Sequence, residues 1–494
     1  MSLIKITNLS FSYPGQDKIF DNISLQLDTE WKIGLIGRNG RGKTTLLGIL
    51  EGTLEYSGSI SSSVSFSYFP FKTENESRSS FEVMKDAAPD TQEWEAEKEI
   101  SLLDLDEEVL SRQFSSLSSG EQMKIKLASL FLSDGPFLLI DEPTNHLDIT
   151  GREVVSRYLS MKKGFILVSH DRYFLDRCTD HILSLNRSDA ELQKGNYSSW
   201  QQNKDYSDSF ELAQNNKLIK EIKRLTEAAG RTAQWSDAVE KTKYSAGNSG
   251  SKPDRGYIGH KSAKMMKRAK VTEARASKSA EEKSKLLKNI ESSQSLMIKN
   301  LQHHSEKLVI AEGLSVLLGG RKIIDGLTFE VKNGSRTVIS GSNGSGKSTL
   351  LKLIAGKGGQ AEFSGELRVP GSLIISYVPQ DTSFLSGDML RYAEAEGIDE
   401  TVFMTNLDKL AFTKDNFRTQ LQDLSDGQKK KILLAASLSR SAHLYIWDEP
   451  LNYIDIISRV QIENLILEYE PAMILVEHDR NFIENTASDC IFLD

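Results

Sequence analysis

The chain has 494 residues, 38% hydrophobic and 26% charged, which is the balance of a globular protein with two or three domains. No apolar run approaches the roughly 20 residues that span a bilayer, and the first residues lack the charged and apolar regions of a secretory signal peptide. A cytoplasmic protein without membrane-spanning segments is therefore expected. The two cysteines, Cys178 and Cys490, are interpreted as buried apolar side chains rather than as a redox pair.

The net charge of −8 hides an asymmetry along the chain. Residues 214–291 hold 19 Lys and Arg against 9 Asp and Glu, a net charge of +10, so the remaining residues carry −18. This distribution argues against a protein coated uniformly for nucleic acid. A basic middle between acidic ends instead indicates a local contact with a polyanion.

The first part of the chain reads as a twisted α/β domain. A strand over Lys32–Ile36 leads into Gly37–Thr44, which matches the G-x-x-x-x-G-K-[ST] phosphate loop, and helical spacing follows over Thr44–Leu50. Phe137–Ile140 and Gly164–Ser169 are apolar runs typical of buried parallel strands. A helical insert is expected around Trp94–Leu117.

The basic middle segment predicts two long helices, over Gln201–Glu240 and Lys261–Glu291. Tyr244–Pro253 between them breaks any helix, so the segment is expected to form an antiparallel α-helical hairpin with a tip near Lys243–Ile258. One interpretation is a solvated linker. The other is contact with RNA, in which cationic and aromatic tip residues neutralise phosphates and stack on bases. The candidate rRNA or tRNA contacts are Lys243, Tyr244, Lys252, Arg255 and Tyr257.

The last part of the chain repeats the first. The strand Thr337–Ser340, the phosphate loop Gly341–Ser348 and the helix Ser348–Ile354 recur in the same order, and a second helical insert is expected around Tyr392–Leu424. Leu444–Trp447 and Ala472–Glu477 are the matching apolar strands. Lys43 and Lys347 are 304 residues apart, and the Asp-Glu-Pro, His-Asp-Arg and Ser-x-Gly motifs recur at offsets of 307, 308 and 307. Four motifs repeating in order predict two copies of one domain.

The sequence therefore predicts an α/β protein with three parts. Two P-loop nucleotide-binding domains are expected over residues 1–200 and 302–494. The helical hairpin linker joins them over residues 201–301, with its tip loop near 241–260.

The phosphate loops carry the first candidate chemistry. Glycines let the backbone wrap closely around phosphate oxygens, and the N–H groups at the start of the next helix face the anion. Lys43 and Lys347 are expected to reach the β- and γ-phosphates of ATP, and Thr44 and Ser348 to place a hydroxyl on Mg²⁺.

Acidic residues follow the apolar strands in both copies. Asp141 and Asp448 are expected to contact Mg²⁺ through water, and Glu142 and Glu449 to polarise the attacking water as catalytic residues. An isolated Asp-Glu-Pro would be a surface turn, but its place after a strand and a phosphate loop favours catalysis. A lone histidine is usually structural; the matched positions of His170 and His478 favour sensing of the γ-phosphate.

These residues, in this order, resemble the ATP-binding cassette superfamily over everything except the middle quarter of the chain. The resemblance implies that Leu117–Glu121 and Leu424–Gln428 are signature motifs, each closing over the nucleotide on the opposite phosphate loop. Lys43 would then face Ser425, and Lys347 would face Ser118. It also implies ATP-binding residues at Tyr13, Gly37, Asn39, Gly40, Gly42, Lys43, Thr44, Thr45, Ser118, Gly120, Gly341, Asn343, Gly344, Gly346, Lys347, Ser348, Thr349, Ser425 and Gly427.

The two copies depart from this pattern differently. Gln380 matches the glutamine that senses Mg²⁺, but Phe71 stands at that position in the first copy. Tyr13 matches the aromatic residue that stacks on adenine, but Leu318 stands there in the second. Thr144 is replaced by Leu451. The sites are therefore expected to be unequal, with hydrolysis at both but at different rates.

Together with the basic hairpin, the tandem cassettes resemble the ABC-F family of translation factors, and more narrowly its Lsa-type antibiotic-resistance group. The residues that carry the narrower resemblance are Trp31–Lys43, Tyr445–Tyr453 and Met266–Arg268, with the chain end at Asp494. It implies a monomer that pairs its own cassettes and binds the 70S ribosome at the exit site, beside P-site tRNA and 23S rRNA. There it would protect against lincosamides, pleuromutilins and streptogramin A compounds, displacing the drug either sterically or by moving rRNA.

Three alternatives stay open from the sequence. The chain is either such a resistance factor or a housekeeping ABC-F translation factor. A third possibility is a nucleic-acid-binding or DNA-repair ATPase. A transporter subunit would need a separate membrane partner, which the basic hairpin does not explain, so no transmembrane partner is expected.

Overall fold

The computed structural model describes residues 2–15, 17–73, 75–133, 135–145, 147–186, 189–241, 260, 264, 267, 271, 278, 296–359, 361–412 and 416–493. The chain divides into two compact units. One joins Met1–Trp200 with Ser293–Asp494 and contains both cassettes, and the other is Gln201–Ser292. Of the helices in the described ranges, none combines the length and apolar character that crossing a bilayer requires.

The first cassette contains two sheets. An antiparallel sheet has the order β2-β1-β4, and a larger sheet has the order β5-β6-β7-β3-β8-β9, parallel except for β9. The strands are β1 (Leu3–Phe11), β2 (Phe20–Asp28), β3 (Lys32–Ile36), β4 (Ser57–Ser61), β5 (Phe66–Phe69), β6 (Phe137–Asp141), β7 (Phe165–Val168), β8 (His181–Leu185) and β9 (Ala190–Lys194).

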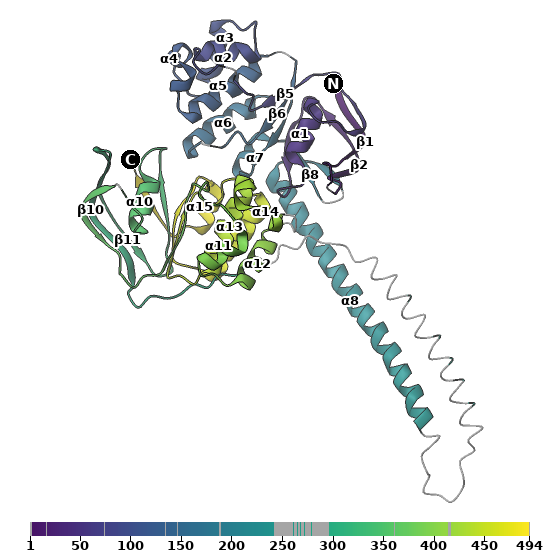
Figure 1. Ribbon diagram of the computed structural model, residues 1–494. Helices are drawn as coiled ribbons and strands as arrows, with labels where there is room; N and C mark the ends of the chain where they lie inside the picture. The colour runs from purple at the N-terminus through teal and green to yellow at the C-terminus, as the bar shows by residue number, and fades with distance from the viewer. Residues whose placement is uncertain are drawn as a thin grey trace, which may run out of the picture. The chain divides into compact units, whose positions relative to one another are not determined.

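The helices of the first cassette lie in different places. Helix α1 follows β3, whereas α2 to α5 gather away from β1 and β2 (Figure 1). Helix α2, the first helix of the insert, lies before the predicted range Trp94–Leu117 and was not predicted. The helices are α1 (Lys43–Glu51), α2 (Ser80–Ala87), α3 (Glu93–Ser101), α4 (Glu108–Ser111), the short 3₁₀ helix η1 (Phe114–Ser116), α5 (Ser119–Leu132), α6 (Ile149–Met161) and α7 (Arg172–Cys178).

The second cassette repeats this topology. Its antiparallel sheet has the order β11-β10-β13, and its parallel sheet has the order β14-β15-β16-β12-β17, strand for strand that of β5-β6-β7-β3-β8. The expected two-fold repetition of an α/β domain is therefore present. The strands are β10 (Lys307–Leu318), β11 (Arg321–Lys332), β12 (Arg336–Gly341), β13 (Glu362–Arg368), β14 (Ile375–Val378), β15 (Leu444–Asp448), β16 (Met473–Val476) and β17 (Asp489–Leu493).

The helices of the second cassette also follow the first. The insert expected around Tyr392–Leu424 begins slightly earlier, at Met389. The helices are α10 (Lys347–Ile354), α11 (Met389–Ala395), α12 (Glu400–Lys409), the 3₁₀ helices η2 (Asn416–Arg418) and η3 (Leu421–Asp423), α13 (Asp426–Ser439), α14 (Ile456–Tyr469) and α15 (Arg480–Thr486).

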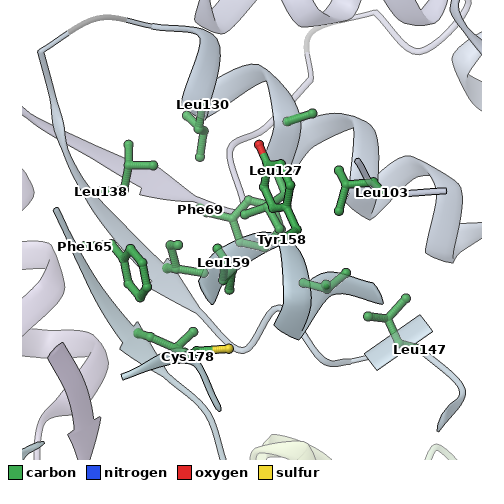
Figure 2. Packing of buried hydrophobic residues seen from close by; sticks show 14 of the residues in the cluster. Phe69, Leu103, Leu127, Leu130, Leu138, Leu147, Tyr158, Leu159, Phe165 and Cys178 are labelled. Atoms are coloured by element: carbon green, nitrogen blue, oxygen red, sulfur yellow. The ribbon is translucent and has the colours of Figure 1, made fainter. Parts of the chain in front are cut away.

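The buried strands have apolar side chains on both faces because each parallel sheet separates two cores. In β6, Phe137 and Leu139 pack with α1 and the antiparallel sheet, while Leu138 and Ile140 pack against the helical layer. The core between the parallel sheet and the helical layer of the first cassette includes the residues labelled in Figure 2. Helices α5 and α6 contribute Leu127, Leu130, Tyr158 and Leu159, and the sheet contributes Phe69, Leu138 and Phe165. Cys178 lies in this core, whereas Cys490 is exposed.

The linker is described over its first helix. Helix α8 runs over Tyr197–Lys241 and contains the helix expected over residues 201–240 (Figure 1). Most of the second expected helix lies outside the described residues, as do Lys243, Tyr244, Lys252, Arg255 and Tyr257, so the hairpin and its tip stay predictions. Residues 296–301 differ from expectation, since Leu296 and Ile298 pack in the core of the second cassette.

Candidate active sites

Each phosphate loop joins a parallel strand to the helix that follows it. Gly42 precedes α1 with φ of 86°, and a Cβ there would lie 2.5 Å from Cγ2 of Ile19. Gly346 precedes α10 with φ of 93°. Only glycine adopts this left-handed conformation at little cost. Each glycine therefore lets the phosphate loop turn directly into the helix. The first N–H groups of that helix, which lack partners within the helix, can then face an anion in the loop.

The phosphate-loop lysines lie folded into their own loops. Nζ of Lys43 donates to the Gly37 carbonyl at 2.8 Å, and Nζ of Lys347 donates to the carbonyls of Gly341 and Ser342 at 2.9 and 2.8 Å. Burial lowers the pKa of both lysines. Each ammonium group is therefore held in the concavity of the loop, where an anionic phosphate oxygen would compensate its burial.

In the first cassette the aspartate at the end of β6 already has two donors. Oγ1 of Thr44 and the hydroxyl of Tyr68 both donate to Oδ2 of Asp141, each at 3.0 Å. Tyr68 was not among the predicted site residues, although its recurrence as Tyr377 in the second copy was a usable signal. A metal ion bound to Oδ2 of Asp141 would compete with the hydrogen bonds from these two hydroxyls.

In the second cassette the matching aspartate is unsatisfied. Asp448 is fully buried, and neither of its carboxylate oxygens has a hydrogen-bond partner in the described part of the chain. Burial raises its pKa, and the Ser348 hydroxyl opposes this shift. Orphaned carboxylate oxygens beside a hydroxyl are the hard ligands that Mg²⁺ prefers. Ser348 and Asp448 therefore fit the predicted Mg²⁺ better than Thr44 and Asp141 do.

The two candidate catalytic glutamates share one backbone conformation. Glu142 and Glu449 have φ of 51° and 47°, in the left-handed region that side chains other than glycine rarely adopt. Oε1 of Glu142 lies 3.4 Å from Nε2 of His170, and Oε1 of Glu449 lies 3.5 Å from Nε2 of His478. The structure thus brings each predicted glutamate together with its predicted histidine.

The surroundings of the two glutamates give them opposite protonation tendencies. Burial, with Asp141 nearby, raises the pKa of Glu142 to about 8, although Arg459 and Lys43 oppose the shift. Burial also acts on Glu449, but His478, Lys430 and Gln380 outweigh it and lower the pKa of this carboxyl. At neutral pH Glu449 is ionised and able to accept a proton, whereas most of Glu142 is protonated.

Amide side chains account for part of this difference. Nε2 of Gln380 and Nδ2 of Asn452 donate to Oε2 of Glu449 at 2.8 and 2.6 Å, so Gln380 contacts the candidate catalytic glutamate rather than Asp448. In the first cassette the matching Phe71 packs against the core. Its carbonyl accepts from Nζ of Lys126 at 3.2 Å, and the same ammonium group lies 5.7 Å from the centre of the Phe71 ring. The difference between Gln380 and Phe71 therefore changes the hydrogen bonding of the glutamate, since only Glu449 has an amide donor from this position among the described residues.

The signature serines begin helices. Ser118 and Ser425 cap α5 and α13 by accepting from the N–H groups of Glu121 and Gln428. Gly427 beside Ser425 is tightly confined, because a Cβ there would lie 2.6 Å from the Tyr453 carbonyl and 3.3 Å from Nδ2 of Asn39. Gly427, in the predicted second signature motif, therefore lies beside Asn39 of the first phosphate loop.

Several other contacts join the two cassettes. Nδ2 of Asn39 donates to the Tyr453 carbonyl at 3.0 Å, and Nη1 of Arg480 donates to Oε1 of Glu153 at 2.9 Å. Arg172 pairs with Glu463. These contacts connect the first cassette to the second near the two candidate sites.

The second phosphate loop borders a cavity of about 680 Å³. The first cassette contributes Ser119, Asn145, Leu147 and Arg152 to its lining, so this cavity is built from both halves of the chain. Gly120 lies beside Leu147. The second cassette contributes, among others, the predicted site residues Asn343, Gly344, Gly346, Lys347, Ser348, Thr349, Gln380, Glu449 and His478.

The two positions compared for adenine stacking also differ in the structure. The Tyr13 hydroxyl lies 3.3 Å from Oγ1 of Thr45, and its ring packs edge-on against Phe11. Leu318 lines the cavity with 45% of its surface exposed. A flat apolar ligand could therefore pack on Leu318, but without the ring stacking that Tyr13 offers.

The contrast between the glutamates predicts opposite pH behaviour of two single variants. Glu449→Gln leaves only the first site, so its ATP turnover should rise with pH through about 8 as Glu142 loses its proton. At pH 7 it should retain about a tenth of wild-type turnover, because about a tenth of a group with pKa 8 is ionised there. Glu142→Gln should lose less than about half and show no such rise. Steady-state phosphate release from pH 6 to 9 measures this. Equal losses with parallel pH profiles would contradict the inequality.

The chain matches a family model described as "ABC transporter" over residues 20–145 and 324–452. It is 28% identical to ATP-binding protein Uup of Caulobacter vibrioides over 495 residues, covering 97% of this chain and 75% of that protein. It is also 28% identical to ribosome protection protein VmlR of Bacillus subtilis over 491 residues, covering 98% of this chain and 86% of the relative.

Solved structures share the fold. An archaeal ribosome recycling factor, aABCE1, in complex with the ribosomal stalk protein aP1 matches with a TM-score of 0.61 at 20% identity. A structure described as RNase-L Inhibitor matches with a TM-score of 0.61 at 19% identity. Each match covers 98% of this chain and 87% of the other.

Proposed function

The chain belongs to the ABC transporter family, its ATP-binding relatives support the ABC-F branch, and on this premise we propose that it is an ABC-F ATPase that acts on the ribosome. ATPase activity itself follows from the two family domains and the ATP-binding relatives. The proposal concerns what the hydrolysis drives and which residues carry it out.

The observation that carries the proposal is the two-sided cavity at the second phosphate loop. It is lined by Lys347 and Glu449 of the second cassette and by Ser119 and Asn145 of the first. A nucleotide bound to both walls favours the state in which the cassettes are paired, because only that state offers both sets of contacts. Hydrolysis then removes the link and lets the cassettes separate.

The residues of each cassette have assigned roles in this cycle. Lys43 and Lys347 bind the phosphates, and Glu142 and Glu449 orient and deprotonate water, each beside its histidine. Mg²⁺, when bound, would neutralise charge on the transferred phosphoryl group. In the second site Ser348 and Asp448 would hold it, and Gln380 keeps Glu449 in place.

Two observations support the ribosome as the partner: the relatives of the chain and its basic segment. VmlR is a ribosome protection protein by its description, and residues 214–291 of this chain carry a net charge of +10. A cationic segment neutralises RNA phosphates and releases counterions. We assign residues 201–301 as the part that reaches the ribosomal exit site, beside P-site tRNA and 23S rRNA. Such a factor works in the cytoplasm, as a monomer.

The narrower proposal is Lsa-type protection against lincosamides, pleuromutilins and streptogramin A compounds. The pairing of the cassettes around ATP would hold the linker in the ribosome, and the linker would dislodge the drug. Its proposed contacts are Lys243, Tyr244, Lys252, Arg255 and Tyr257, which lie outside the described residues.

Ribosome binding is tested with the variant Glu142→Gln plus Glu449→Gln. Because it keeps the phosphate loops but lacks both water-activating carboxylates, it should hold ATP and co-sediment with 70S particles. The variant should leave the ribosome pellet when ADP replaces ATP. Its absence from the 70S fraction with ATP would refute the ribosome proposal and leave a nucleic-acid or repair ATPase.

Drug protection is tested separately by expressing the wild-type chain in a susceptible bacterium. Raised inhibitory concentrations are expected for the three drug classes, and the double variant should not raise them, because it cannot complete the cycle. Unchanged values for all three classes, with ribosome binding intact, would favour the housekeeping translation factor.

A further inference from the structure

Helix α13 carries a buried lysine that the cycle above does not use. Lys430 is 2% exposed, and its Nζ donates to the Pro379 carbonyl at 2.9 Å and to the Asp448 carbonyl at 3.0 Å. One bond reaches the loop that presents Gln380, and the other reaches the end of β15. In the described ranges Lys430 forms no ion pair, so its charge is balanced by backbone dipoles and by acids farther away.

The first cassette provides an internal comparison. Met123 stands at the position of Lys430, five residues after the signature serine in each copy. A lysine three residues later, Lys126, donates to the Phe71 carbonyl at 3.2 Å. It thus reaches the loop that matches the Gln380 loop, but no hydrogen bond from it to β6 is formed among the described residues. Only the second cassette joins that loop to the strand end through one ammonium group.

A second buried charge accompanies Lys430. Glu477 is 2% exposed, and its carboxylate accepts from the N–H groups of Leu451 and His478 at 2.7 and 3.0 Å. The matching residue of the first cassette is the neutral Ser169, whose hydroxyl lies 3.5 Å from that of Thr144. The second site therefore has a buried cation and a buried anion where the first has Met123 and Ser169.

We propose that Lys430 is a positioning residue of the second ATP site, which ties the Gln380 loop to the end of β15. The proposal rests on the assignment of Glu449 and Asp448 to hydrolysis at that site. Gln380 donates to Glu449 from the loop, and Glu449 follows directly after the strand. Because the Gln380 loop and the end of β15 are bonded to one ammonium group, the Gln380 amide and the Glu449 carboxylate keep a fixed geometry. Charge-assisted bonds from a buried ammonium are stronger than neutral ones.

The test uses the full chain with Glu142→Gln, in which only the second site turns over. Adding Lys430→Met, the residue of the first cassette, should lower kcat about tenfold, as loss of an outer support typically does. The KM for ATP should change little, because the phosphate loop is untouched. Lys430→Arg should keep turnover near the parental rate, because arginine stays charged and can still donate to both carbonyls.

Lys429→Met is the matched control on the same helix and should leave kcat unchanged. A fall in kcat for Lys430→Met that Lys430→Arg does not rescue would overturn the proposal. So would an unchanged kcat. If Lys430→Met does not fold, Lys430→Gln takes its place. It should lower kcat with little change in the KM for ATP, and a parental kcat would overturn the proposal. Absence of turnover in the Glu142→Gln parent would instead refute the role of Glu449.

Discussion

Replacing both Glu142 and Glu449 by glutamine is expected to lower ATP turnover by about 100-fold or more, the usual range for loss of a general base. Glutamine keeps the size of the side chain and its bonds to Gln380 or Asn452 can re-form, but it cannot accept the proton of water. Both candidate bases are removed, so the unequal sites cannot compensate for each other. ATP binding should persist, because Lys43 and Lys347 keep their places in the loops.

Turnover is measured as phosphate release at saturating ATP, and binding as the change in fluorescence of a labelled nucleotide. The control is Glu30→Gln, the same chemical change at a residue whose side chain is 61% exposed and pairs with the exposed Lys163. It should retain full turnover. Residual turnover of the double variant above about a tenth of wild type would mean that another group activates the water.

Lys431→Met is expected to destabilise the protein by about 3–5 kcal/mol, because it leaves a buried charge without its partner. Nζ of Lys431 lies 2.9 Å from Oδ2 of Asp455, and the side chains are 3% and 0% exposed. Burial opposes ionisation of Asp455, but Lys431 holds the pKa of this carboxyl below its usual value. Asp455 also caps α14, so the change disturbs the start of that helix.

The measurement is the midpoint of urea unfolding of the full chain, followed by tryptophan fluorescence. Lys124→Met is the matched control, since Lys124 occupies the same place in the first cassette but, among the described residues, donates only to the Leu103 carbonyl, at 2.9 Å. It should cost about 1 kcal/mol, the typical net value of one hydrogen bond. Equal losses in the two variants would show that the Lys431–Asp455 pair adds nothing beyond its bond to the Leu410 carbonyl.

The predicted elements were most accurate where a local pattern decides the structure. The apolar runs at Phe137–Ile140 and Leu444–Trp447 became β6 and β15, since a strand covered on both faces needs apolar residues throughout. Helix α2 was missed because its eight residues, Ser80–Ala87, mix polar and apolar side chains over barely two turns. Its capping box at Ser79 and Glu82 was the signal available in the sequence.

The phosphate loops, the acidic strand ends and the two matched histidines could be predicted from the amino-acid sequence, because each motif needs particular residue types at short spacing. The motifs do not distinguish Glu142 from Glu449, which share the local sequence Asp-Glu-Pro. The different protonation of the two glutamates near neutral pH arises only in the folded chain. The reason is that their pKa values depend on Arg459, Gln380 and Lys430, groups that folding brings from distant parts of the chain.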